Sequence, residues 1–368
     1  NPAKYNGYKA YGSDGCQVAL EMADAILDEI NRLDIFRDVK HMDYDAAVEQ
    51  GSIKAIGEDV VIAFLNAVKS PSILDCSDSD LKVVYTPLNG SGKMCVTRIF
   101  NMIGIKNITI VPEQSEPDGN FPTCPYPNPE FREALQVGLN LCESVQPDLL
   151  VATAPDCDRM GIAVRHNGDY QLLNGNEVGV LLLDFIARNR IANGTMPKHP
   201  VAVKTIVSTD LTDSVAKEYG IELRSVLTGF KYIGDQIAGL EANGEESRYI
   251  FGFEESYGYL SGSYVRDKDA VNASMLVCEM AVDYKKQGKT LVDAIHDIYE
   301  KHGYFLNELM NFTCEGQDDM NKMQSIMEHL RTNTPTKIAG FAVVGWSDYK
   351  ASNCFDCTIE TEITLPKS

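Results

Sequence analysis

The chain has 368 residues, of which 44% are hydrophobic and 23% are charged, and its formal net charge is −20 at pH 7. The length and composition are those of a soluble globular protein with roughly two to four domains. The excess of negative charge argues against binding to nucleic acids or to anionic membranes, so an anionic substrate would need a local group of basic residues.

The cysteines and apolar segments indicate a reduced, cytoplasmic protein. Ten cysteines are spaced too irregularly for a disulfide framework, and Cys354 and Cys357 form a lone C-x-x-C without a second pair. No apolar run is long enough to span a membrane, and we expect no signal peptide. Because the first residue is Asn1, we expect that the gene product begins upstream of it.

The N-terminal part is predicted to contain a loop and two helices. Residues 1–9 are rich in turn-forming types, which favours a loop. Apolar residues recur at helical spacing over residues 18–33 and again over 58–68, which predicts two amphipathic helices. The polar stretch 70–80 is the first plausible domain boundary.

A glycine-rich turn, TPLNGSGK, follows a predicted strand at residues 82–85 and precedes a predicted helix at 96–103. Such a turn could offer backbone N–H groups to an anion. It is not a Walker loop, because Met94 stands where Ser or Thr would follow Lys93. It also fails the dinucleotide-binding pattern, because Cys95 occupies the place of the third glycine.

Acidic residues separate two short apolar runs further along the chain. Residues 149–152 predict a buried parallel strand, and a second apolar run covers 161–164. Between them lie Asp156, Asp158 and Arg159. The two carboxylates can bend round one hard cation such as Mg²⁺, and the arginine adds a planar donor for phosphate. The alternative interpretation is a solvated acidic turn with one arginine partner.

Strands and helices alternate in two consecutive units of the same order. A helix at residues 176–190 closes the first unit, and the second begins after the polar stretch 191–200. This rhythm predicts tandem duplicated α/β domains with mixed sheets, followed by part of an α+β C-terminal domain. The other predicted strands lie at 107–111, 201–207, 223–226, 249–251, shortly after 305 and at 341–344. The other predicted helices lie at 130–143, 211–219, 232–240, 272–287, 291–302 and 320–330. Residues 358–365 are predicted to form an extended end.

Polar loops follow the strands of the second unit. Glu254 and Ser256 could hydrogen-bond vicinal sugar hydroxyls, since a carboxylate accepts and a hydroxyl does either. Lys231, Arg266 and Lys268 could hold a phosphate. Taken singly, the serine is equally explained as a helix cap and the basic residues as members of surface ion pairs.

Six segments, taken in chain order, resemble the motifs of the α-D-phosphohexomutases, the phosphoglucomutase and phosphomannomutase superfamily. They are NPAKYNGYK, TPLNGSGK, APDCDR, LTGFK, FGFEESYG and YVRDKD. The resemblance implies transfer of phosphate between the 6- and 1-positions of an aldohexose through a phosphoserine, Mg²⁺ and a bisphosphorylated intermediate. Three positions depart from the family: Asn89 replaces a histidine, Ala154 replaces the first aspartate of D-P-D-x-D-R, and Ala270 replaces a glycine.

The resemblance also implies roles for individual residues. Asp156 and Asp158 would bind Mg²⁺, Arg159 would contact the transferred phosphate, and Lys9 would act as general acid or base. Hexose phosphates and hexose 1,6-bisphosphate would be the ligands, with glucose, mannose or a pentose left open as the sugar. The substrate-binding residues would be Thr228, Gly229, Lys231, Glu254, Ser256, Arg266 and Lys268.

The family has four domains, and the resemblance implies the following division of this chain. The parts are the C-terminal part of domain 1 (1–78), the metal-binding domain 2 (79–197), the sugar-binding domain 3 (198–303) and the first half of domain 4 (304–368). The family's T-A-S-H serine loop and R-x-S-G-T-E-P loop have no counterpart in the chain. We therefore expect a fragment without turnover that self-associates through its truncated domains.

Two other classes of function stay open. Ala154 and the missing serine loop also suit a non-catalytic sugar-phosphate binding protein. A D-x-D sequence is also found in Mg²⁺-dependent glycosyltransferases and in aspartyl phosphatases. The phosphatase motif requires Thr or Val where Met160 stands, which argues against that class.

Overall fold

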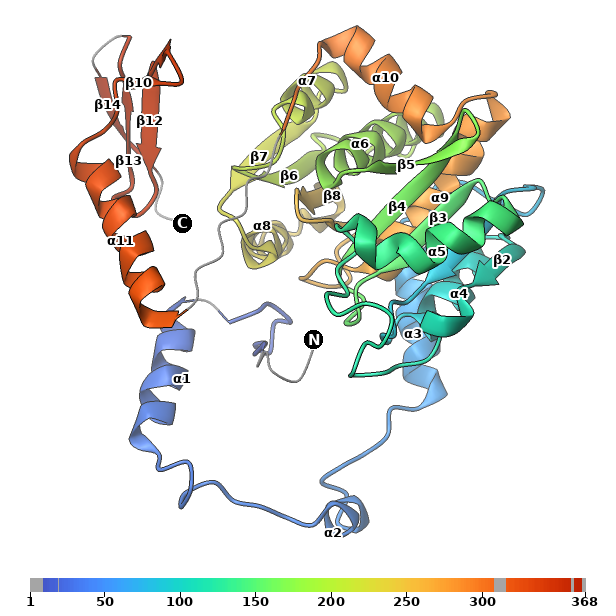
Figure 1. Cartoon of the computed structure of the whole chain (residues 1–368), viewed down its shortest axis with the longest axis horizontal. Coiled ribbons are helices and arrows are strands. Elements are labelled where there is room, and N and C mark those ends of the chain that lie inside the picture. The colour runs from blue at the N-terminus through green and yellow to red at the C-terminus, as the bar shows by residue number, and fades with distance from the viewer. Residues whose placement is uncertain (1–8, 19, 308–315, 359–360, 366–368) are drawn as a thin grey trace. The chain divides into compact units, whose positions relative to one another are not determined.

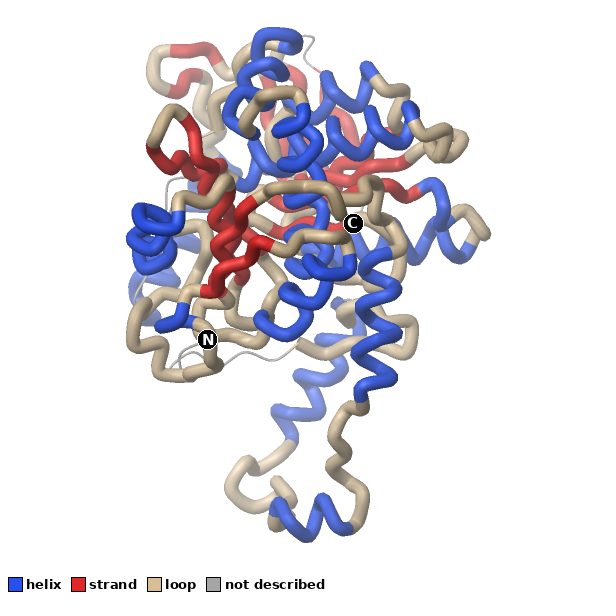
Figure 2. Tube along the Cα trace, turned by 90° about the vertical axis from the view of Figure 1, so that its right-hand side faces the viewer, coloured by secondary structure: helices blue, strands red, loops and turns tan. Residues whose placement is uncertain are grey.

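A computed structural model describes residues 9–18, 20–307, 316–358 and 361–365, and it divides the chain into two compact units, 1–305 and 306–368 (Figure 1). Figure 2 shows the helices in blue and the strands in red, in a view turned by 90°. Among the described residues, no helix combines the length and apolar character that crossing a membrane requires.

The first sheet has five strands in the order β2-β1-β3-β4-β5. Strands β2, β1 and β3 are parallel, whereas β4 and β5 are antiparallel to their neighbours. The predicted buried parallel strand is confirmed, because every residue of β3 is buried and β3 pairs with β1 in parallel. The strands are β1 (Lys82–Thr86), β2 (Asn107–Ile110), β3 (Leu149–Thr153), β4 (Met160–His166) and β5 (Asp169–Leu173).

The second sheet repeats this order, as β7-β6-β8-β9. In both sheets the first strand lies between the second and third, and an antiparallel strand follows the third. The predicted duplication of a mixed α/β domain is therefore confirmed. The strands are β6 (Val201–Thr205), β7 (Glu222–Val226), β8 (Tyr249–Glu254) and β9 (Gly258–Leu260).

Helices cover both sheets (Figure 1). Helix α5 packs against β1 and β3, and α8 packs against β6 and β8. Helix α9 contacts α3 and α4 as well as β4 and β9, so it lies between the elements of the two sheets. The helices are α3 (Glu58–Lys69), α4 (Lys93–Met102), η1 (Pro112–Gln114), α5 (Arg132–Val145), α6 (Gly175–Ala192), α7 (Leu211–Glu218), α8 (Phe230–Ala242), η2 (Glu246–Arg248), α9 (Ala270–Lys286) and α10 (Leu291–His302).

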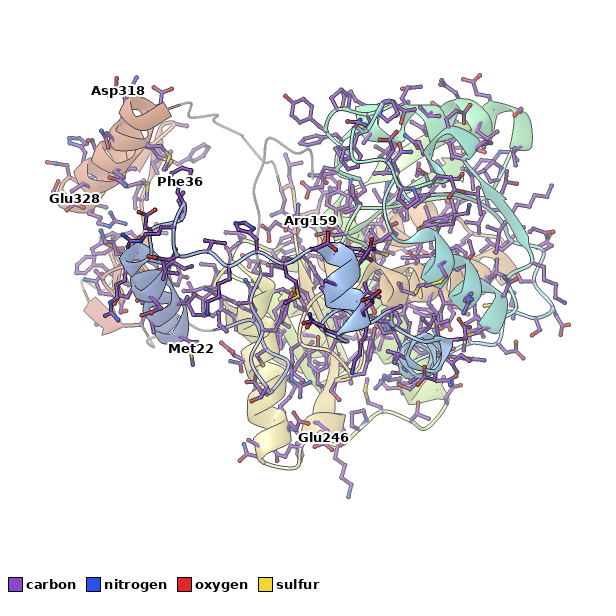
Figure 3. All side chains as sticks on the ribbon, turned by 90° about the horizontal axis from the view of Figure 1, so that it is seen from below. Met22, Phe36, Arg159, Glu246, Asp318 and Glu328 are labelled. Atoms are coloured by element: carbon purple, nitrogen blue, oxygen red, sulfur yellow. The ribbon has the colours of Figure 1, made fainter. Side chains whose placement is uncertain are left out.

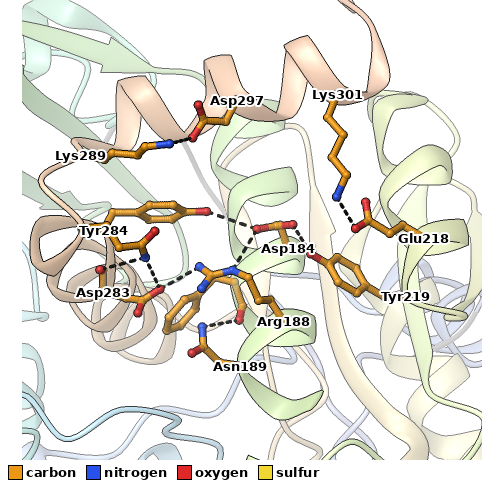
Figure 4. Close-up of polar contacts among 12 residues, drawn as sticks. Asp184, Arg188, Asn189, Glu218, Tyr219, Asp283, Tyr284, Lys289, Asp297 and Lys301 are labelled. Atoms are coloured by element: carbon orange, nitrogen blue, oxygen red, sulfur yellow. Dashed lines mark hydrogen bonds and ion pairs between the residues drawn. The ribbon is translucent and has the colours of Figure 1, made fainter. Parts of the chain in front are cut away.

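Helix α6 is buried over most of its length because it is apolar on nearly every side. The predicted boundary at residue 197 assigns it to the first α/β domain, but it packs against α7 and β8 of the second. Asp184, the charged residue in its middle, accepts hydrogen bonds from the Tyr219 hydroxyl at 2.7 Å and the Tyr284 hydroxyl at 3.3 Å (Figure 4). Arg188 lies 3.8 Å from Asp184 and 2.8 Å from Asp283, so this buried charge is paired.

The N-terminal part of the first unit adds a short hairpin over residues 9–18 and the helices α1 (Leu20–Arg32) and α2 (Tyr44–Glu49). The helix predicted at 18–33 is thus present. Large apolar side chains in this region are exposed, among them Met22 at 56% and Phe36 at 94% (Figure 3).

The second unit is a helix followed by short antiparallel strands, which agrees with the predicted α+β character. Arg331 joins the helix to the sheet through Asp348, at 3.1 Å, and Trp346 stacks on Phe355. Most of the strand expected shortly after residue 305 falls outside the described residues. The elements are α11 (Gly316–Thr332), β10 (Lys337–Ile338), β11 (Phe341–Ala342), β12 (Gly345–Asp348), β13 (Asn353–Asp356) and β14 (Thr361–Thr364).

Candidate functional site

The acidic loop, residues 154–159, connects the antiparallel strands β3 and β4. The Ala154 N–H donates to the Arg159 carbonyl at 2.9 Å, and the Cys157 N–H donates to the Ala154 carbonyl at 2.8 Å. Cys157 has a left-handed conformation, with φ of 59°, which completes the reversal. The loop brings the carboxyl groups of Asp156 and Asp158 near enough for each to shift the pKa of the other.

The two aspartates titrate differently because their neighbours differ. Burial and the adjacent Asp158 carboxylate raise the pKa of Asp156. Burial works against the charge of Asp158 as well, but the ammonium groups of Lys268 and Lys9 hold the pKa of Asp158 below its usual value. One carboxyl group of the pair is therefore kept ionised by cations while the other is pushed toward the neutral form.

The glycine-rich turn supports the acidic loop from one side. The Ser91 N–H and hydroxyl both donate to the Pro155 carbonyl, at 2.8 and 3.0 Å. A Cβ on Gly90 would lie 2.2 Å from the Pro155 Cα, so only glycine allows this approach. The anion-binding prediction for this turn is wrong for three of its amides, because those of Asn89, Gly90 and Ser91 donate to protein carbonyls.

Residues 254–258, named the sugar loop after their predicted role, connect β8 and β9 next to the acidic loop. The Met160 N–H donates to the Tyr257 carbonyl at 3.0 Å, and Arg159 forms a backbone bridge with Gly258. Glu254 is 4% exposed, and one of its oxygens accepts a hydrogen bond from the Gly229 N–H at 3.0 Å. Burial raises the pKa of Glu254, although Lys268 opposes the shift.

Lys268 connects the acidic loop to the sugar loop. Its Nζ lies 3.5 Å from an Asp158 oxygen and 3.7 Å from a Glu254 oxygen, and its side chain is 11% exposed. Lys9 approaches the same Asp158 oxygen from the N-terminal hairpin, at 3.1 Å. Burial works against the charge of Lys9, but Asp158 and Asp267 raise the pKa of Lys9. The structure therefore brings five predicted site residues together from distant parts of the sequence.

Other predicted site residues have protein partners or lie apart. The guanidinium of Arg159, labelled in Figure 3, lies 3.0 Å from Glu130, whose side chain is 14% exposed. Arg266 forms an ion pair with Glu241 and donates to the Ser263 carbonyl at 2.6 Å, and it lines a pocket together with Tyr11, Asp267 and Lys268. Lys231 lies over the Tyr232 ring. Thr228 is exposed, and Ser256 is partly exposed in the sugar loop.

Three residues near the site were not predicted: Tyr11, Glu130 and Asp267. Tyr11 donates to Asp267 at 2.7 Å, and Asp267 lies 3.5 Å from Lys268. Asp267 stands inside the YVRDKD motif, and Tyr11 is two residues from Lys9, so proximity to predicted residues is the only sequence signal for either. Glu130 begins the helix predicted at 130–143 but lies just before α5 in the structure, and nothing in the sequence connects it with the site.

The donor set at the acidic loop fits a magnesium ion. In the described part of the chain, no group of three or more His, Cys, Asp or Glu side chains is placed to hold a metal. The acidic loop offers two adjacent carboxylates, those of Asp156 and Asp158. Mg²⁺ commonly binds one or two carboxylates while it keeps several waters. A cation there would also relieve the repulsion between Asp156 and Asp158.

Comparisons with known proteins match both α/β domains. The family models described as phosphoglucomutase/phosphomannomutase, alpha/beta/alpha domain II and domain III match residues 59–168 and 174–302. A phosphoglucomutase of Staphylococcus aureus is 36% identical over the whole chain, which spans 65% of that relative's length.

Solved structures share the fold at lower identity. A putative phosphomannomutase from Thermus thermophilus has a TM-score of 0.53 and 23% identity, over 66% of this chain and 51% of its own. Parafusin, a phosphoglucomutase from Paramecium, has a TM-score of 0.53 and 17% identity, over 83% of this chain and 50% of its own.

Proposed function

Because the chain belongs to the phosphoglucomutase/phosphomannomutase family, we propose that the protein interconverts hexose 1-phosphate and hexose 6-phosphate in the cytoplasm, through a phosphoserine and a hexose 1,6-bisphosphate. The observation that carries this proposal is the position of Lys268, between Asp158 of the acidic loop and Glu254 of the sugar loop. A phosphate held by this lysine would have the metal ligands on one side and a sugar-binding carboxylate on the other.

The basic residues would bind and stabilise the phosphoryl group. In-line phosphoryl transfer depends on positioning and on neutralising the charge of the equatorial oxygens. Lys268 and Arg159 supply positive charge next to the acidic loop. Mg²⁺, held by Asp156 and Asp158, would neutralise further charge on the same group.

Lys9 would transfer a proton, and Glu254 would bind sugar hydroxyls. Lys9 would be the general acid that donates a proton to the oxygen released as a P–O bond breaks; its raised pKa keeps it protonated but also makes it a weaker acid than a free lysine. Glu254 is buried and fixed by the Gly229 amide, so its second oxygen can accept from a sugar hydroxyl. Ser256, Thr228 and Lys231 would complete the sugar and phosphate contacts.

The second candidate is a non-catalytic sugar-phosphate binding protein, which Ala154 favours because it removes a carboxylate that the family uses for the metal. Both candidates require binding, but only a mutase requires turnover. A coupled assay of hexose 1-phosphate conversion, on protein that carries the family's T-A-S-H loop, separates the two.

Binding itself is tested by isothermal titration in the presence of Mg²⁺. We expect glucose 1-phosphate, glucose 6-phosphate and glucose 1,6-bisphosphate to bind, and UDP-glucose not to bind. Lys268→Met should weaken binding of the bisphosphate by about tenfold or more, because it removes a charge-assisted contact. The matched control is Lys289→Met, which removes a lysine paired with Asp297 on α10. Preferential binding of UDP-glucose would instead indicate a glycosyltransferase.

A further inference from the structure

The side chains of Tyr11 and Asp267 join the N-terminal hairpin to the loop that carries Lys268. We call this pair of residues the clasp. The Tyr11 hydroxyl donates to Asp267 Oδ2 at 2.7 Å. The Lys9 Nζ lies 3.7 Å from the same oxygen. The other oxygen, Oδ1, accepts from the Lys268 backbone N–H at 2.9 Å and lies 3.5 Å from the Lys268 Nζ. One carboxylate therefore contacts both of the lysines that flank Asp158.

The hairpin gives the clasp a defined backbone. Tyr11 pairs with Gln17 in an antiparallel bridge. The Gly12 N–H donates to the Cys16 carbonyl at 2.9 Å, and the Val18 N–H donates to the Ala10 carbonyl at 3.0 Å. Residues two apart in an extended strand point to the same side, which explains how Lys9 and Tyr11 can both reach Asp267. Fixing Tyr11 on Asp267 therefore also restricts Lys9.

The charges show why such a restriction matters. Lys9 is 42% exposed at its side chain, and a long exposed lysine loses rotamer entropy when it is held in one place. Lys9 and Lys268 both approach one oxygen of Asp158, so their ammonium groups repel each other. Asp267 provides a second negative charge between them. Asp158 and Asp267 thus compensate the charges of both lysines, and Glu254 lies 3.7 Å from Lys268 as well.

We propose that Tyr11 and Asp267 are positioning residues, which hold Lys9 and Lys268 at the spacing needed to bind one phosphoryl group beside the acidic loop. The inference rests on the proposed function, because it gives the two lysines a common phosphate ligand. Preorganised cations bind such a group without first having to be ordered. Neither clasp residue needs to touch the ligand.

The first experiment measures hydrogen exchange of the hairpin amides in the unliganded chain. Tyr11→Phe removes only the hydroxyl and leaves the ring. We expect exchange at the Gly12 and Val18 amides to become about tenfold faster, because a hydrogen bond to a charged group is lost. The matched control is Tyr219→Phe, which removes a phenol–aspartate bond of the same 2.7 Å length in the α6 network. It should leave the hairpin amides unchanged.

The second experiment measures affinity for glucose 1,6-bisphosphate with Mg²⁺ by isothermal titration. Tyr11→Phe and Asp267→Ala should each weaken binding, by about threefold to tenfold, whereas Tyr219→Phe should not. Asp267→Glu keeps the carboxylate and should restore part of the affinity that Asp267→Ala loses. The double variant Tyr11→Phe/Asp267→Ala should lose little more than Asp267→Ala alone, since the two residues act as a unit.

The outcomes separate the inference from the proposed function. Unchanged exchange at Gly12 and Val18 in Tyr11→Phe would overturn the clasp. Faster exchange with unchanged affinity would reduce it to a structural tie and overturn the positioning role. Failure of the unmodified chain to bind the bisphosphate would overturn the proposed function and the phosphate-binding role with it, while the exchange data would still decide whether the clasp itself exists.

Discussion

Asp158 interacts with residues that come from several separate motifs of the sequence. Lys9 and Lys268 both lie within 3.5 Å of one of its oxygens, and the neighbouring Asp156 carboxyl group interacts with it electrostatically. The lysines favour the ionised form of Asp158, and its partner carboxyl group is pushed toward the neutral form. A metal ion bound by this pair would lie next to the ammonium groups of Lys9 and Lys268, which already compensate the charge of Asp158.

Replacing Ala154 by aspartate should strengthen that cation site. Ala154 is 6% exposed and begins the acidic loop, so a carboxylate there would join two others. We expect Ala154→Asp to tighten Mg²⁺ binding by about tenfold and to lower the melting temperature without metal, because three carboxylates repel one another. Titration calorimetry and thermal melts measure both effects. Ala154→Asn has a similar volume without the charge, and equal Mg²⁺ affinity in all three proteins would show that this loop is not the metal site.

A buried carboxylate outside the site should make stability depend on pH. Glu279 on α9 is fully buried and accepts hydrogen bonds from the Ser72 hydroxyl and from the Ile73 and Leu74 amides. Burial raises the pKa of Glu279 to about 7. The folded state thus binds this proton more tightly than the unfolded state, so the stability that protonation provides is complete below about pH 4.5 and is lost as pH rises toward 7.

The variant Glu279→Gln should flatten this dependence. Between pH 5 and pH 8 the unmodified chain should lose up to about 3 kcal/mol that the variant does not lose. Denaturant unfolding at the two pH values measures the difference. Glu300→Gln, an exposed glutamate on α10, should keep the slope of the unmodified chain. If Glu279→Gln also keeps that slope, Glu279 does not titrate in this range.

At the scale of elements, close packing between α6 and β8 holds the sugar loop in place. A Cβ on Gly179 would lie 2.3 Å from the ring of Phe253, the residue before Glu254. Gly179→Ala should therefore destabilise the fold by about 2 kcal/mol or more and weaken sugar-phosphate binding. Chemical denaturation and calorimetry measure the two effects.

The control for this variant is another helical glycine with open space around it. A Cβ on Gly239 of α8 would meet no atom within 4 Å, so Gly239→Ala should stabilise the fold by about 0.5–1 kcal/mol. Destabilisation by both variants to the same extent would mean that the α6–β8 contact is not what Gly179 protects.

The elements differ in how well the sequence predicted them. Long apolar runs and clear helical spacing predicted β3, α9 and α10, because burial on several sides leaves a strong pattern. Strands β5 and β9 were missed. Residues of β5 are mostly exposed or half-buried, and β9 has only three residues, so neither leaves a run that periodicity detects.

The same limit applies to the site. Asp156, Asp158, Glu254 and Lys268 stand in motifs, so the sequence could identify them. The partners Tyr11 and Asp267 are 256 positions apart, and their contact depends on how the hairpin meets the second α/β domain. Arg266 shows the converse, because it belongs to a motif yet pairs with Glu241. A motif names residue types, whereas side-chain partners follow from tertiary packing.

On the scale of the whole molecule, the site lies within the first compact unit, and α9 connects its parts. Glu279 of α9 binds the connector after α3, and Lys285 of α9 lies 2.9 Å from both Asp80 and Asp148 beside the first sheet. The Ala270 N–H at the start of α9 donates to the Cys157 carbonyl in the acidic loop at 3.1 Å. One helix therefore contacts the connector, the first sheet and the acidic loop, while it continues the chain from Lys268.

The most direct test of the proposed site is to locate a metal ion and a sugar phosphate together in a crystal of the chain. Mn²⁺ suits the same oxygen ligands as Mg²⁺ and can be located by anomalous diffraction. With glucose 1,6-bisphosphate present, we predict one Mn²⁺ ion within about 2.5 Å of carboxylate oxygens of both Asp156 and Asp158. A phosphate should lie against Lys268 and a sugar hydroxyl against Glu254. A metal ion bound elsewhere, or a ligand that contacts neither loop, would show that these residues do not form the binding site.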